Sequence, residues 1–172
     1  TLILLNPSFV GEFVVTSDMS VNGYAFAGVT GLTKITLSEG VSSLVPYEFG
    51  GTINVEEIVL PATVTKIPSY AFSNATLDSF TLPETVTSME EYAFTKCDIK
   101  SISISKLLKE IPSNAFAGSL GLEEINFYGD VSNLTTIGDY AFEDCESLAK
   151  INLPETITKF GESTFKNTGF VE

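Results

Sequence analysis

Two cysteines, Cys97 and Cys145, are the most reactive side chains in this sequence. A thiolate can act as a nucleophile or bind a metal ion, and two thiols can form a disulfide. The chain contains no histidine, so the usual general base for a cysteine or serine nucleophile is absent, and so is the commonest zinc ligand. A serine nucleophile would be left with only the uncommon lysine-dependent arrangement. These residue types therefore form no recognisable catalytic set.

Carboxylates are the second group that could do chemistry. Glycosidases use two acids that face each other across a cleft, and adjacent pairs occur at 56–57 and 123–124. The segment "EDCES" (143–147) gathers three further acids, but no Asp-x-Asp-x-Asp-Gly calcium loop is present. Because the pairs recur at equivalent places in a repeat, a solvated face is the better interpretation. We expect no enzymatic activity, no bound metal and no cofactor.

Charge and composition restrict the partners. Nine lysines stand against 22 acidic residues, and the formal net charge is −13. Such a field repels nucleic acid and anionic lipid. The chain has no arginine, which removes the fork that grips phosphate and carboxylate in a bidentate manner. No apolar run approaches the ~20 residues that span a bilayer, so we expect no membrane insertion in this segment.

An internal repeat sets the elements that would position any site. The dipeptide Ala-Phe occurs five times, and Glu48-Phe49 and Thr164-Phe165 occupy the same place in two further units. Successive phenylalanines are 22 to 26 residues apart. This regular spacing identifies a repeat protein. The seven phenylalanines are Phe26, Phe49, Phe72, Phe94, Phe116, Phe142 and Phe165.

A second signature, apolar-x-x-apolar-x-apolar, follows six of these phenylalanines. Its alternation is typical of a short strand with one buried face. Proline follows directly at Pro61, Pro83 and Pro154 and ends the strand, because proline has no amide hydrogen for the ladder. No unit can bury its apolar side alone, so stacked units must share one core. We therefore predict that the phenylalanines stack as an internal column.

These motifs resemble the BspA-like class of leucine-rich repeats, whose units read L-x-x-I-x-L-P-x-x-v-x-x-I-x-x-x-A-F-x-x-C over about 23 residues. The place of the asparagine in ordinary leucine-rich repeats holds Gly40, Thr63, Thr85, Leu107, Asp130 and Thr156. The resemblance implies a right-handed β-solenoid of about seven units. Short parallel strands would form the concave face. Turns and short helical or extended segments would form the convex face. The resemblance also implies a secreted or surface protein of the kind found in bacteria and some protozoa. Several proteins of this class are adhesins, and the class has no catalytic residues to transfer.

The repeat also assigns a place to the cysteines. Each lies three residues after its phenylalanine, where other units carry small residues such as Ala75 and Ser119. Two units at ~4.8 Å per strand separate their Cα atoms by ~10 Å, beyond the ~7 Å reach of a disulfide. We interpret Cys97 and Cys145 as structural core residues.

The outward strand positions are the candidate binding surface. They form a polar stripe flanked by charged residues, and a protein or glycan could lie across it. The alternative is that these residues are simply solvated strand formers. The stripe lacks the aromatic platform of many sugar-binding proteins, and Tyr128 at its edge comes nearest. The candidate residues are Thr36, Val59, Thr81, Ser103, Asn126, Asn152, Glu56, Glu57, Asp78 and Tyr128.

Residues 1–20 lack the repeat register and are interpreted as an irregular lead-in, either a degenerate first repeat or an N-terminal cap. Residues 21–172 are leucine-rich repeats of 22–26 residues with a truncated last unit, and we expect a fragment of a longer chain. The predicted function is a non-catalytic recognition module of an extracellular or cell-surface adhesin, with an unidentified protein or glycan ligand. The alternative is a passive spacer that projects another domain from the cell surface.

Overall fold

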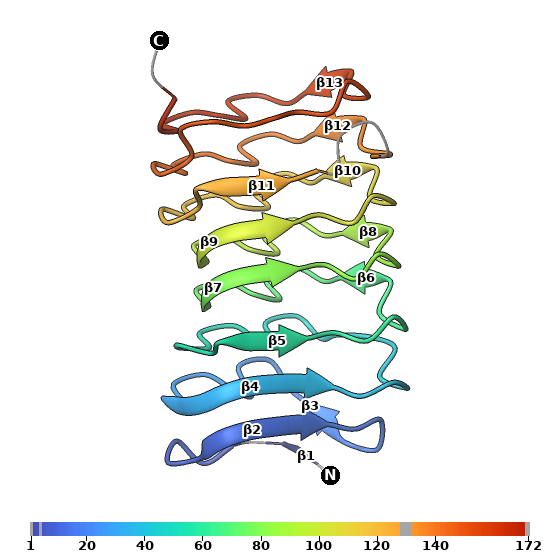
Figure 1. Cartoon of the computed structure of the whole chain (residues 1–172), viewed down its shortest axis with the longest axis vertical. Coiled ribbons are helices and arrows are strands. Elements are labelled where there is room, and N and C mark those ends of the chain that lie inside the picture. Colours follow the sequence, from blue (N-terminus) through green and yellow to red (C-terminus); the bar gives the residue numbers. More distant parts are fainter. Residues whose placement is uncertain (1, 4, 128–131, 171–172) are drawn as a thin grey trace.

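The computed structural model describes residues 2–3, 5–127 and 132–170. Over these residues the chain winds into a β-solenoid, a stack of similar turns with one end of the chain at each end of the stack (Figure 1). The seven repeat phenylalanines mark about seven turns. Every strand pair is parallel, because each turn contributes its strand in the same direction as the turn before it.

The longer strands form one side of the stack, here called the sheet face (Figure 1). They are grouped in two sheets, in the orders β2-β4-β5 and β7-β9-β11. Their inward residues stack like on like: Ile35 pairs with Ile58, and Phe80 pairs with Ile102. The strands are β2 (Val10–Val15), β4 (Gly31–Leu37), β5 (Glu57–Val59), β7 (Thr76–Thr81), β9 (Asp98–Ser103) and β11 (Glu124–Asn126).

A second column consists of two-residue strands. It forms the sheets β1-β3, β6-β8 and β10-β12-β13. Residues 41–45, which lie between β3 and β6 in chain order, include no strand. The strands are β1 (Leu2–Ile3), β3 (Ser20–Val21), β6 (Lys66–Ile67), β8 (Ser88–Met89), β10 (Glu110–Ile111), β12 (Thr136–Ile137) and β13 (Lys159–Phe160).

The phenylalanines form the predicted column through the core. Neighbouring ring centroids are 4.6 to 5.9 Å apart, and the ring planes differ by 2 to 19°. This spacing matches the ~4.8 Å rise between parallel strands. The first six rings are fully buried, and Phe165 is half-buried beside Phe160 and Phe170. The column is therefore the shared core that no single unit could form.

The repeat phenylalanines lie in tight turns, and the described residues contain no helix. The short helical segments allowed by the resemblance are thus replaced by turns. The physical reason is that residues two before and two after each phenylalanine have positive φ, such as Tyr70 (59°) and Asn74 (56°) around Phe72. Left-handed residues interrupt a right-handed helix. Glycine fills the second position in three units, for example Gly51 with φ 66°.

Residues 10–15 occupy the strand position of a repeat although their sequence lacks the motif. Phe13 pairs with Ile35 and Val15 with Leu37, but the register shifts between Gly11 and Glu12. A shift of this kind displaces the apolar positions, which explains why the motif is not visible in the sequence. On this register we propose that the lead-in is a degenerate first repeat rather than a cap.

Candidate binding surface

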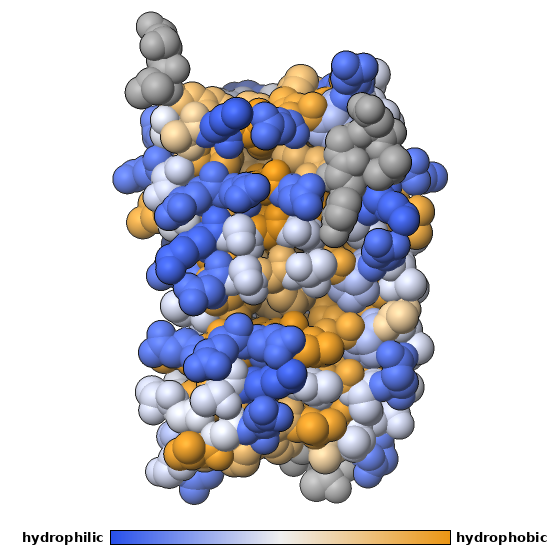
Figure 2. Space-filling view, in the orientation of Figure 1, coloured by the Kyte–Doolittle hydropathy of each residue, from blue (hydrophilic) through white to orange (hydrophobic). Residues whose placement is uncertain are grey.

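The predicted polar stripe lies along the sheet face. Strand register places Thr36 beside Val59, and Thr81, Ser103 and Asn126 side by side. Asn152 is exposed but lies in a segment without a strand. Figure 2 shows rows of hydrophilic side chains across this face with apolar surface between them. Tyr128 lies outside the described residues.

The acids of the candidate site are mostly paired with lysines. Glu57 Oε2 lies 2.7 Å from Lys34 Nζ, and Asp78 Oδ1 lies 2.9 Å from Lys100 Nζ. The hydrogen bond to Glu57 raises the pKa of Lys34 above its ordinary value, and the bond to Asp78 does the same for Lys100. Such exposed pairs add little to stability. They do hold the charged groups in fixed positions across neighbouring strands.

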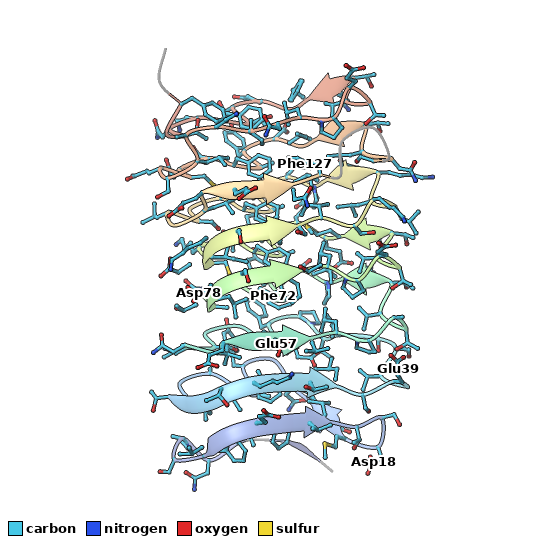
Figure 3. All side chains as sticks on the ribbon, viewed as in Figure 1. Asp18, Glu39, Glu57, Phe72, Asp78 and Phe127 are labelled. Atoms are coloured by element: carbon cyan, nitrogen blue, oxygen red, sulfur yellow. The ribbon has the colours of Figure 1, made fainter. Side chains whose placement is uncertain are left out.

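The sheet face is divided between β5 and β7. These strands belong to different sheets. Ahead of β5 the two turns stay joined, because Val55 forms an isolated bridge with Leu77 and the amide of Thr76 donates to the carbonyl of Thr52 at 2.8 Å. Figure 3 labels Glu57 on one side of the division and Asp78 on the other.

Two hollows of ≈310 and ≈440 Å³ lie at this division. Both include Glu56, whose carboxylate forms no ion pair or hydrogen bond with the described residues. Asp78 lines the smaller hollow, and Glu57, Val59 and Thr81 line the larger. We call these two hollows the β5–β7 groove. It brings together five of the ten predicted residues, whereas Thr36, Ser103, Asn126 and Asn152 lie outside it.

A second surface, a ladder of tyrosines, was not predicted from the sequence. Tyr24, Tyr47, Tyr70 and Tyr92 stack in a ladder with centroids 4.7 to 4.9 Å apart. A hollow of ≈380 Å³ beside the ladder also includes Lys96. The signal was present, because tyrosine precedes the repeat phenylalanine by two residues in five units.

The tyrosine ladder differs from a sugar-stacking platform. Each inner ring covers the faces of its neighbours, so the ladder exposes ring edges rather than faces. Burial, followed by the neighbouring Tyr47, Tyr92 and Glu91, raises the pKa of Tyr70. All four tyrosines have φ between 59 and 62°, a strained backbone for a bulky side chain. The equivalent Asn114 and Ser163, which have no ring to stack, also have positive φ (57 and 50°), so the turn itself requires this conformation.

The remaining reactive groups are occupied or buried. Cys97 and Cys145 are both 0% exposed, and burial raises the pKa of each thiol, to about 12 for Cys145. In "EDCES", Glu143 pairs with Lys166, and Asp144 accepts a hydrogen bond from Asn167. Across residues 2–3, 5–127 and 132–170, no three His, Cys, Asp or Glu residues gather as metal ligands. No helix in that part of the chain could cross a membrane.

Family comparison identifies the repeat. A model described as "BspA type Leucine rich repeat region (6 copies)" matches residues 12–123 and 42–172. The two matches together include most of the chain and contain all seven repeat phenylalanines. A search of curated proteins found no match.

Solved structures share the fold. A leucine-rich repeat protein from Bacteroides ovatus is 23% identical, with a TM-score of 0.61 over 98% of this chain and 50% of that one. The pneumococcal vaccine antigen PcpA is 20% identical, with a TM-score of 0.55 over 94% of this chain and 41% of that one. A T. pallidum leucine-rich repeat protein is 20% identical, with a TM-score of 0.52 over 86% and 77%. This chain thus spans about half the length of the B. ovatus protein.

Proposed function

This chain belongs to the BspA-type leucine-rich repeat family, and on that premise we propose that it is a non-catalytic recognition module of a secreted or cell-surface adhesin. Its sheet face binds a protein or glycan. The similarity to a protein described as a pneumococcal vaccine antigen supports the surface location in this proposal.

The observation that carries the proposal is the β5–β7 groove. A uniform solenoid needs no break in its strand ladder, yet β5 and β7 belong to separate sheets, and two hollows lie between them. The groove presents the unpaired carboxylate of Glu56 and the hydroxyl group of Thr81. Hydrogen-bonding groups around a partly apolar floor are what a protein or glycan ligand requires.

A passive spacer is the second candidate, and the phenylalanine column favours it. Seven rings stacked at 4.6 to 5.9 Å make a continuous core along the whole stack. Such a core gives a stiff rod that could project another domain without touching a ligand.

Charge reversal distinguishes the two functions. The triple variant Glu56→Lys, Glu57→Lys and Asp78→Lys changes the groove, while Glu91→Lys, Glu110→Lys and Glu155→Lys changes the charge equally at exposed acids outside it. Both variants and the wild type would be applied to a glycan array and to immobilised extracellular-matrix proteins. Recognition predicts that binding falls roughly tenfold or more in the groove variant alone. Equal binding by all three proteins would contradict recognition through the groove, and no binding by the wild type would favour the spacer.

A further inference from the structure

One unit departs from the repeat at Glu48. The residue before the repeat phenylalanine is alanine in five units, and Ala25 and Ala71 in the flanking units are buried. Glu48 occupies the same slot and is only 2% exposed. A carboxylate in a buried alanine slot is costly unless it has partners or a ligand.

The same unit lacks its short strand. In the units of Phe94, Phe142 and Phe165, the amide four residues before the repeat phenylalanine donates to the carbonyl of the preceding short strand, whereas the units of Phe72 and Phe116 have proline at this place. Examples are Glu90 to Ile67 at 2.9 Å and Gly138 to Ile111 at 2.8 Å. Here the corresponding amide, that of Val45, donates to Glu48 Oε2 at 2.8 Å. One of the two carboxylate oxygens of Glu48 therefore takes the place of a backbone carbonyl as the acceptor.

The second oxygen has no protein partner. Glu48 Oε1 accepts no hydrogen bond from the described residues. None of their fully buried side-chain oxygens or nitrogens lacks a partner, so Oε1, which has none, is not fully buried. Glu48 lines a cavity of ≈340 Å³ between the segments 15–21 and 40–48. This places Oε1 at the cavity, within reach of solvent or a ligand.

The cavity is polar and carries a single charge. Glu48 is the only charged residue in its lining, which also includes Ser17, Ser42 and Ser43. These three hydroxyls make no hydrogen bond with other described residues. Asp18 and Glu39 lie on the loops that border the cavity, at the same edge of the stack (Figure 3). The wall and rim thus offer acceptors and negative charge, with no lysine among the lining residues.

We propose that this cavity binds a primary ammonium group of a small amine, with Glu48 as its counter-ion and the serine hydroxyls as further acceptors. A single carboxylate is too few ligands for a divalent metal ion, which takes six or more oxygens as calcium or an octahedral set as magnesium. An anion would meet Glu48 and the chain's net charge of −13. A cation relieves the cost of the buried carboxylate. Burial is also the main reason that the pKa of Glu48 is raised to about 7.

Titration of the ¹⁵N-labelled chain with ethanolamine at pH 8 tests the site by NMR. We expect saturable shifts at the amides of residues 42–45, 47 and 48, with a dissociation constant on the order of 1–10 mM for so small a ligand. Ethylene glycol and glycolate are the neutral and anionic controls of similar size. Nα-acetyl-lysine methylamide presents the same ammonium group on a peptide. Tighter binding of that compound than of ethanolamine would identify a protein lysine as the source of the ammonium.

Two variants make the test specific to Glu48. Glu48→Gln keeps the shape without the charge, and Glu48→Ala restores the residue of the other units. Both should weaken ethanolamine binding roughly tenfold or more. The proposal is overturned if either folded variant binds like the wild type, if ethylene glycol binds as well as ethanolamine, or if no shift saturates. Because the cavity shares no lining residue with the β5–β7 groove, this result is independent of the proposed adhesin function.

Discussion

The ring of Phe72 lies 4.6 Å from the ring of Phe94, and their planes differ by 2°. The two residues belong to successive turns, 22 positions apart in the sequence. Each ring therefore contributes to the cores of two units at once. Loss of one ring should therefore weaken the packing between neighbouring turns, and not only the packing within its own turn.

Phe94→Ala tests this coupling. Phe94 contacts Phe72, Phe80 and Phe116 and is fully buried, so the truncation leaves a cavity. We expect urea denaturation to show a loss of ~3–5 kcal/mol in the free energy of unfolding. The control Ser103→Ala, on the sheet face, should cost less than about 0.5 kcal/mol. Similar losses at the two positions would mean that inside and outside are wrongly assigned.

The column and the strands could be predicted because their signals are periodic. Phenylalanine returns every 22 to 26 residues, and residues such as Ile102 and Ile104 alternate with polar ones. A periodic pattern predicts stacking, because each position has an equivalent in the next turn. Pairing of Ser103 with Thr81 and Asn126 follows from the same periodicity.

Departures from the period could not be predicted in this way. The division between β5 and β7 occurs although both units carry the strand motif, so the motif alone does not predict it. Glu48 was visible as a replaced alanine, but only the structure shows that its carboxylate is buried beside a cavity. The four tyrosines of the ladder have positive φ, whereas bulky residues usually have negative φ. Local conformational preferences therefore do not predict the ladder.

At Tyr70, substitution by glycine should destabilise the protein less than substitution by alanine. Its φ of 59° is strained for any residue with a Cβ atom, and stacking on Tyr47 and Tyr92 offsets that strain. Both Tyr70→Ala and Tyr70→Gly lose the stacking, but only glycine also relieves the strain. We expect the glycine variant to be more stable than the alanine variant by about 1 kcal/mol in urea denaturation. An alanine variant of equal or greater stability would show that the backbone is not strained there.

Glu48 should make stability depend on pH near neutrality. Burial raises its pKa from 4.5 to about 7, so the folded state binds the proton more tightly than the unfolded chain does. Its stabilising contribution is fully present below about pH 4.5 and is lost as pH rises through 7, by about 3 kcal/mol in total. The chain has no histidine to titrate in the same window.

Denaturation of the wild type and Glu48→Gln between pH 5 and 8 measures this contribution directly. The difference in unfolding free energy between the two proteins should shift in favour of Glu48→Gln as pH rises. A pH-independent difference would mean that the carboxyl group is not desolvated in the folded state.

The two thiols should react only after unfolding. Cys97 and Cys145 are 0% exposed, and burial raises the pKa of both, so little thiolate is present at pH 8. We expect an aromatic disulfide reagent to label neither cysteine in the folded protein and both in urea. Rapid labelling of either residue without denaturant would contradict its interpretation as a core residue.

The most direct test of recognition by the sheet face is an uncharged obstruction of the β5–β7 groove. Thr81→Trp places a bulky ring at an exposed position in the groove, and Ser88→Trp places the same ring at an exposed position on β8 outside it. Dissociation constants would be measured for the strongest binder from the glycan and matrix-protein panel. The proposal predicts an increase of roughly tenfold or more for Thr81→Trp and no change for Ser88→Trp. Unchanged binding by Thr81→Trp would contradict it.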